Sequence, residues 1–235
     1  MSGAGSVVWW HFHGFVLTES LGLSVAISAL LVLVAVLAGR RFVATGPQGR
    51  LAQAVEVAYT LMHDAVAEVV PPGDVPRVLP FVGTLWLFVL VANLAGLIPG
   101  LSSPTGDLSV TAALALLVFL AVHYYGIRAA GLRAYLRHYL SPSPILLPFE
   151  LVSEVTRTLA LAIRLFGNMM SLEMAALLVL LVAGLLVPVP LLLLHVVEAL
   201  VQAYIFGMLA LIYIGSGLEA ARAAASSPSE PKESP

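Results

Sequence analysis

The chain has 235 residues, of which 60% are hydrophobic and only 10% are charged, and its formal net charge is −2. Soluble domains carry about 25% charged residues, so this composition excludes an ordinary soluble protein and indicates an integral membrane protein without nucleic acid as a partner. The chain has no cysteine, which excludes disulfides, thiolate metal sites and cysteine nucleophiles.

Five apolar segments are long enough to cross a bilayer, which takes about 20 residues. They cover residues 15–38, 78–98, 108–127, 148–187 and 191–217. The first lacks the basic start of a signal peptide and is too long for its apolar core, so we expect it to remain as a span. The sequence therefore predicts an all-α membrane protein in which residues 1–217 form one transmembrane domain.

An amphipathic pattern lies between the first two spans. Apolar residues from Leu51 to Met62 recur at helical spacing, whereas Gln53 and Glu56 fall on other faces. This pattern predicts an amphipathic helix over residues 50–70, lying at the cytoplasmic surface and ended by the sequence PPG.

The arginines predict the orientation, because basic residues favour the cytoplasmic side of short loops. Arginines flank the amphipathic segment and follow the third span, whereas residues 1–14, 99–107 and 187–190 contain no Lys or Arg. We therefore expect the N-terminus outside and the C-terminus in the cytoplasm. Residues 218–235 end in a polar stretch rich in Ser and Pro, which predicts a disordered cytoplasmic tail.

The fourth segment is unusually long. About 40 residues at 1.5 Å each make a helix of ~60 Å, roughly twice the ~30 Å hydrocarbon core. The segment either breaks, near Gly167 or Gly184, or lies strongly tilted. The short VPVP turn that follows predicts a tilted antiparallel hairpin with the last span.

Polar side chains form stripes on both helices of this hairpin. At helical spacing, one face of the fourth segment carries Glu150, Glu154, Arg157, Arg164, Asn168 and Ser171. Glu173 lies about 180° from Arg164 and faces elsewhere. The last segment carries a second stripe of His195, Glu198, Gln202 and Tyr213. Because the two segments form a hairpin, we expect the stripes to meet.

Arg164 favours a functional interpretation. A buried arginine in a span costs from ~3 kcal/mol to more than ~10 kcal/mol, and no carboxylate lies one turn away on its helix to pair with it. Glu173, His195 and Glu198 are three titratable groups near one membrane depth, which indicates a pathway containing water.

Blander interpretations stay open for the other stripe residues. Glu150, Glu154 and Arg157 fit a solvated helix start as well as a role in ion passage, and Asn168 and Gln202 fit simple hydrogen bonding between helices. The pair His11 and His13 has no second cluster to complete a metal site. No catalytic triad, phosphate loop or dinucleotide motif is present, so we expect neither a cofactor nor chemistry by this chain alone.

The sequence LAIRLFGNMMSLE at residues 161–173 strongly resembles subunit a of the F-type ATP synthase, the stationary membrane subunit beside the rotating c-ring. Further similar segments stand in family order: GRLAQAVE at 49–56, LPFVGTLWLFVLVANLAGLIPG at 79–100, PTGDLSVT at 104–111 and HVVEALVQAYIFGMLALIYI at 195–214. The similarity spans most of residues 47–214.

The resemblance implies roles for single residues. Arg164 matches the family's essential arginine, Asn168 its nearby amide, and Gln202 the glutamine that packs close to the arginine. Glu173 and His195 match positions of the outer half-channel, and Glu150 an acidic position of the inner one. The chain departs from common family residues at Thr158, Ala160, Gly96 and Ser109.

The resemblance also implies a mechanism. Protons would enter from outside along Glu173, His195 and Glu198 and leave past Glu150 and Glu154, while Asn168, Ser171, Gln202 and Tyr213 support the pathway. The implied partners are the ring carboxylates that face Arg164, the peripheral-stalk subunit b, protons and the bilayer of a bacterial plasma membrane. Two rival readings remain: a self-contained transporter whose Arg164 binds an anion, and a purely structural membrane anchor.

Overall fold

The computed structural model describes residues 8–12, 15–45, 49–98, 101–133, 135, 147–183 and 188–226. Within these residues, helices make up nearly all of the regular structure, and five of them are long and apolar enough to cross a membrane. The prediction of an all-α, multi-pass membrane protein is therefore confirmed.

The described helices correspond closely to the predicted segments. They are α1 (Glu19–Thr45), α2 (Arg50–Val69), α3 (Val75–Ala95), α4 (Leu108–Ala130), α6 (Leu147–Ala183) and α7 (Pro188–Ser226), with one 3₁₀ turn, η1 (Pro104–Gly106). Two short strands, β1 (Val8–Phe12) and β2 (Phe15–Thr18), form an antiparallel hairpin before α1. Residues 15–18 were expected to open the first span, but their backbone pairs with β1 as strand β2.

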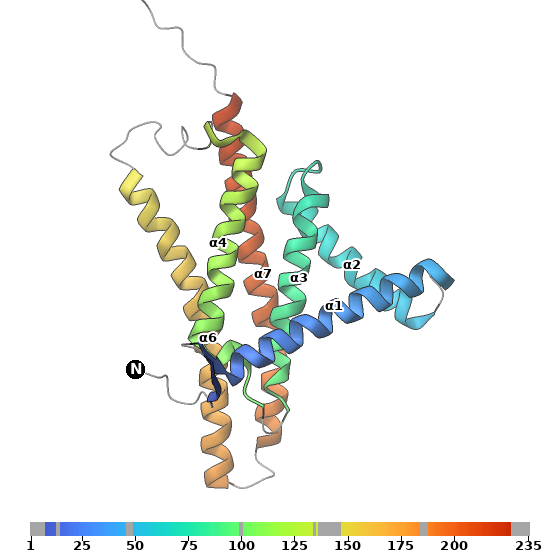
Figure 1. The fold of residues 1–235 in the computed structure, drawn as a ribbon, viewed down its shortest axis with the longest axis vertical. Coiled ribbons are helices and arrows are strands. Elements are labelled where there is room, and N and C mark those ends of the chain that lie inside the picture. Colours follow the sequence, from blue (N-terminus) through green and yellow to red (C-terminus); the bar gives the residue numbers. More distant parts are fainter. Residues whose placement is uncertain are drawn as a thin grey trace, which may run out of the picture.

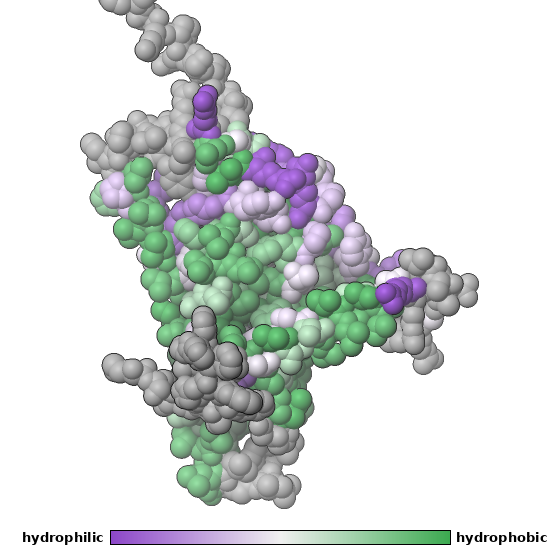
Figure 2. All heavy atoms as spheres, in the orientation of Figure 1, coloured by the Kyte–Doolittle hydropathy of each residue, from purple (hydrophilic) through white to green (hydrophobic). Residues whose placement is uncertain are grey.

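Helices α3, α4, α6 and α7 lie side by side as a bundle, in which α7 contacts each of the other three (Figure 1). Helix α6 runs antiparallel to α7, and its N-terminal part leans away from α4 and α7. Helix α1 crosses α3 and extends away from the bundle together with α2. Figure 2 shows a broad hydrophobic surface over this face and hydrophilic residues gathered near the end where α3 begins and α7 ends.

Both long helices continue through positions where an end was expected. Helix α6 is unbroken at Gly167, whereas Gly184 lies outside the described residues. Helix α7 continues to Ser226, so residues 218–226 are helical and the predicted tail is wrong for them. Leu218 and Ala221 explain this extension, because both are buried against the bundle. Residues 227–235 lie outside the described residues.

Small residues bring α7 close to its neighbours. A Cβ atom on Gly207 would lie only 1.8 Å from Nε1 of Trp86 on α3, whose indole N–H donates to the backbone oxygen of Tyr204 at 3.3 Å. Gly215 approaches Val69, and Gly217 approaches Val122, with virtual Cβ distances of 2.9 and 3.0 Å. The close packing of α7 against its neighbours therefore requires glycine at positions where no side chain fits.

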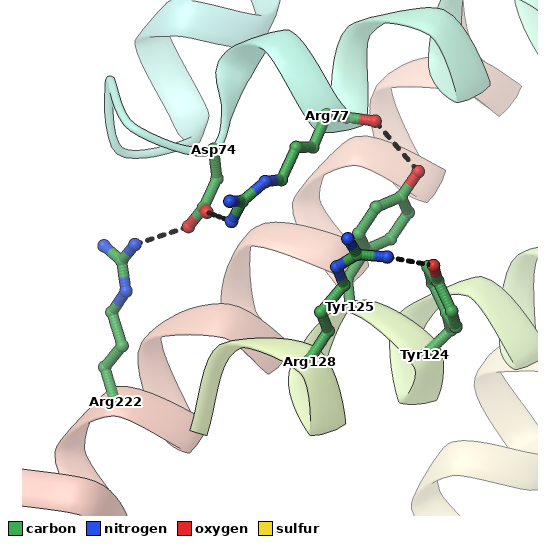
Figure 3. A network of polar contacts seen from close by, with 6 residues as sticks. All are labelled: Asp74, Arg77, Tyr124, Tyr125, Arg128 and Arg222. Carbon is green, nitrogen blue, oxygen red and sulfur yellow. Dashed lines mark hydrogen bonds and ion pairs between the residues drawn. The ribbon is translucent and has the colours of Figure 1, made fainter. Parts of the chain in front are cut away.

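A polar network fastens the end of the bundle where α3 begins (Figure 3). The buried carboxylate of Asp74 accepts from Arg222 on α7 at 2.5 Å and from Arg77 at 3.4 Å. The hydroxyl of Tyr125 on α4 donates to the backbone oxygen of Arg77 at 3.0 Å. The network therefore joins the turn between α2 and α3 to the ends of α4 and α7.

Asp107 fastens the opposite end. Its carboxylate accepts from the backbone N–H and the hydroxyl of Ser109, at 2.9 and 2.8 Å, and from the hydroxyl of Ser20 on α1 at 2.5 Å. Burial opposes the charged form, but these hydrogen bonds outweigh it and lower the pKa of Asp107. Asp107 therefore caps α4 and holds the start of α1 beside it.

Candidate functional site

Arg164 lies on α6 with its side chain exposed. Within the described residues, its guanidinium makes no hydrogen bond or ion pair. Leu159 and Ile163 on the same helix are 54% and 57% exposed, so exposed apolar side chains flank the polar stripe that carries the cation. Such a charge has no place in lipid unless a partner covers it, because an unpaired charge in hydrocarbon is expensive. The structural alternative, an ion pair inside the chain, is not found among the described residues.

The two predicted stripes meet one turn beyond Arg164. The side-chain amide of Asn168 donates to Oε1 of Gln202 at 2.7 Å and joins α6 to α7. Gln202 is 2% exposed, and its own amide nitrogen has no partner among the described residues. A buried donor of this kind is a place where water can bind. Ser171 lies exposed farther along α6.

A polar cluster surrounds Glu173 where η1 folds back against α6. The Glu173 carboxylate accepts from the backbone N–H of Ser103 at 2.8 Å. The hydroxyl of Thr105 forms a hydrogen bond with the hydroxyl of Ser103 at 2.7 Å and donates to the side-chain oxygen of Asn93 at 2.6 Å. His195 on α7 is buried, and its Nε2 donates to the backbone oxygen of Asn93 at 3.1 Å. We call Asn93, Ser103, Thr105, Glu173 and His195 the η1 cluster.

Two glycines allow this close packing. A Cβ atom on Gly106 would lie 3.1 Å from a carboxylate oxygen of Glu173, and one on Gly96 would lie 3.3 Å from Cε1 of His195. A side chain at Gly96 would therefore approach both Ser103 and the imidazole of His195. Glu198 follows His195 by about one helical turn and is partly buried.

A cavity of about 190 Å³ opens between α4, α6 and α7. Along α6 it lies before Arg164, whereas Glu173 of the η1 cluster lies after it. The cavity wall includes four residues of the predicted stripes, namely Glu150, Glu154, Arg157 and Tyr213. The guanidinium of Arg157 lies 5.7 Å from the centre of the Tyr213 ring, within the range of a cation–π interaction. His123 of α4 lines the same cavity.

The η1 cluster and the cavity contain residues that the sequence stripes did not include. Asn93, Ser103, Thr105 and His123 all come from segments outside the hairpin of α6 and α7. A signal existed for Asn93 and His123, because each is a polar residue inside an apolar span. Ser103 and Thr105 belong to a short loop and carry no such signal. Among the described residues, no group of three or more acidic or histidine side chains is placed to hold a metal ion, and His13 lies outside them.

Comparison with known proteins assigns the chain to a family. The sequence model of the family described as ATP synthase A chain matches residues 22–215. The chain is 55% identical over 217 residues to a protein of Hahella chejuensis named ATP synthase subunit a 1, covering 92% of this chain and 91% of that protein.

Two other similar proteins agree with this assignment. ATP synthase subunit a 2 of Pelobacter propionicus is 65% identical over 170 residues, covering 72% of this chain and 74% of that protein. ATP synthase subunit a of Legionella pneumophila strain Corby is 61% identical over 165 residues, covering 70% and 71%. With most of its length matched, the chain belongs to the family of F-type ATP synthase subunit a.

Proposed function

We propose that this chain is the stator subunit a of a proton-driven ATP synthase, and that Arg164 couples proton flow to the rotation of a c-ring and to ATP synthesis. The observation that carries the proposal is the exposed guanidinium of Arg164 on a membrane-spanning helix, where it has no polar partner among the described residues. A cation in this position requires a passing anion, and a ring of membrane-embedded carboxylates supplies one.

Two separate half-channels lead toward this arginine. Along α6, Glu154 precedes Arg164 by ~15 Å and Glu173 follows it by ~14 Å, at 1.5 Å per residue. The cavity with Glu150 and Glu154 is the inner half-channel, and the η1 cluster with Glu198 is the outer one. Because they lie on opposite sides of Arg164, no single polar passage needs to cross the membrane.

The chemistry follows from charge and solvation. A ring carboxylate that faces lipid is stable only when it is neutral, whereas beside Arg164 it is favoured as an anion. Arg164 thus causes each arriving site to release its proton on one side and to take up another after it has passed. The fixed positive charge also repels a proton that would cross directly from one half-channel to the other. Asn168, Ser171 and Gln202 hold the arginine and water at this point.

The arginines support a definite orientation in the bilayer. Arg77, Arg128 and Arg222 belong to the end of the bundle where α3 begins and α4 and α7 end (Figure 3), and Arg133 follows the end of α4 by three residues. Basic residues favour the cytoplasmic side, so this end faces the cytoplasm of a bacterial plasma membrane and the start of α1 faces outside. The c-ring then covers the face of α6 that carries Arg164, and subunit b of the peripheral stalk binds elsewhere on the membrane-embedded surface.

The test replaces Arg164 by Ala and by Lys in the complete ATP synthase, with Arg133→Ala as a control for losing an exposed arginine. We expect both Arg164 variants to reach the membrane, because the side chain makes no polar contact in the described part of the chain, and to lose ATP-driven proton pumping in membrane vesicles. Undiminished coupled pumping by Arg164→Ala would refute the proposal. Transport by the purified chain alone would favour the rival transporter, and full activity of Arg164→Lys would favour a mere anchor.

A further inference from the structure

His123 has one ring nitrogen whose proton is assigned by its contact. Nδ1 lies 2.8 Å from the backbone oxygen of Phe119, one turn earlier on α4. A carbonyl oxygen can only accept, so Nδ1 must carry a hydrogen in both charge states of the imidazole. Nε2 is therefore the nitrogen that gains and loses a proton.

Nε2 of His123 faces a carboxylate across the cavity wall. It lies 3.3 Å from Oε2 of Glu154 on α6. With Nδ1 protonated, a neutral imidazole presents a lone pair at Nε2, and an ionised carboxylate presents only lone pairs as well. The contact is attractive when one proton lies between them, either on the imidazole, which then donates to the carboxylate, or on the carboxylic acid, which then donates to Nε2. Both forms are neutral overall.

The surroundings fix the pair while leaving water access to it. The imidazole ring packs against Phe119, with ring centres 4.3 Å apart, and against Tyr135 at 6.0 Å. The side chains of His123 and Glu154 remain 27% and 20% exposed, whereas the Oε2 atom of Glu154 is itself buried. The other titratable groups on the cavity wall are Glu150 and Arg157 of α6, Tyr213 of α7 and Tyr135. The cation of Arg157 offsets the negative charge that remains when the pair loses its proton.

We propose that His123 and Glu154 share one proton and form the proton-exchanging station of the inner half-channel. This inference rests on the proposed function. In ATP-driven pumping, the pair passes its proton through water toward the rotor and then regains one from the solution at the cavity mouth. It thus alternates between one bound proton and none, and no bond other than that to the proton is made or broken.

The test compares His123→Asn and Glu154→Gln with His63→Asn in the complete ATP synthase. Asparagine keeps an N–H that can reach the oxygen of Phe119 but has no titrating nitrogen. His63 is a matched control, because it also lies 3.3 Å from a carboxylate, that of Asp64, but on the exposed surface of α2. Initial rates of ATP-driven pumping are measured in inverted vesicles as the pH of the medium, which bathes the cavity, is raised from 6 to 9.

We expect the pumping rate of each variant, divided by the rate of the control, to fall as the pH rises. Free protons become scarce at high pH, and these variants lack the pair that would hold a proton ready for transfer. The fall should reach about tenfold, less than the 10²–10⁴ of an indispensable proton-transfer group, since water and Glu150 remain. The double variant should fall no further than either single one, because the pair holds a single proton. A ratio independent of pH or independent effects of the two changes would overturn the inference, as would loss of both single variants from the membrane.

A parallel Arg164→Ala sample separates the two proposals. If it keeps coupled pumping, the proposed function fails. If it loses pumping while His123→Asn follows the control at every pH, only the proton-exchanging pair is wrong.

Discussion

Asn168 of α6 and Gln202 of α7 are joined by a 2.7 Å hydrogen bond one turn from Arg164. This contact fixes the register of the two longest helices at the depth where the arginine emerges from the chain. Because Gln202 uses its oxygen for this bond, its buried amide N–H points to no described protein group and remains available to water. Removing either partner therefore changes both helix packing and the polar environment of Arg164.

A double-mutant cycle measures this bond. We expect Asn168→Ala and Gln202→Ala each to lower the free energy of unfolding, and their combined effect to be less than the sum by about 1 kcal/mol, the usual net worth of such a hydrogen bond. Thermal unfolding of the purified chain in detergent supplies the three differences, with the exposed Ser171→Ala as a control. Strict additivity would mean that the two side chains do not interact.

Gly207 tests the contact between α3 and α7. A methyl group there would collide with the indole of Trp86, so Gly207→Ala should destabilise the chain by about 1–3 kcal/mol or prevent its accumulation in the membrane. Gly167→Ala is the matched control, because nothing lies within 4 Å of its virtual Cβ. The combination of Gly207→Ala with Trp86→Leu should recover part of the loss. Equal amounts of the Gly207 and Gly167 variants in membranes would contradict the close approach.

The broad outline of the fold was predictable because a bilayer imposes one simple length requirement. Each predicted span has a helix in the structure, and the amphipathic pattern at residues 50–70 corresponds to α2. The predicted element boundaries are wrong where tertiary contacts determine the local structure. Leu218 and Ala221 extend α7 because they find buried positions on the bundle, and no local signal marks them. Residues 15–18 pair with β1 although their composition also suits a span.

Asp107 predicts a pH dependence of stability. Its pKa is lower in the folded chain than in the unfolded one, so it stabilises the fold above its unfolded value of about 3.8. This contribution is lost as the pH falls through the lower folded value. We expect the melting temperature of the wild-type chain in detergent to drop below about pH 4, and Asp107→Asn to show a smaller drop. Ser20→Ala, which removes one donor, should lie between the two. Identical profiles for all three chains would refute this assignment.

Arg222 and Arg77 predict unequal effects, although both pair with Asp74. Arg222 reaches the buried carboxylate from a distant helix at 2.5 Å, whereas Arg77 lies 3.4 Å away and is mostly exposed. Arg222→Ala should lower the free energy of unfolding by about 1–3 kcal/mol, because it weakens compensation of a buried charge, and Arg77→Ala by less than about 1 kcal/mol. Urea or thermal unfolding in detergent can rank them. The reverse order would show that the contact with α7 is unimportant.

The part of the site that comes from a single helix was predictable. Helical spacing placed Glu150, Glu154 and Arg157 on one stripe, and the structure gathers them on one cavity wall. It could not indicate that His123 approaches Glu154 from α4, because this contact depends on how two helices pack. The same holds for Ser103, whose backbone reaches Glu173 across 70 residues of sequence.

Helix α1 differs from the rest of the bundle in how little of it touches the chain. Only 6% of the residues in its most apolar stretch are buried, and its one described side-chain hydrogen bond to a distant segment is that from Ser20 to Asp107. Exchanges among Leu, Val and Ile along α1 therefore leave intramolecular packing almost untouched, whereas Gly207 and its neighbours on α7 admit no such freedom. The sequence of this peripheral helix can therefore change to suit its surroundings, whereas residues on the inner helices can change only if their mutual packing is preserved.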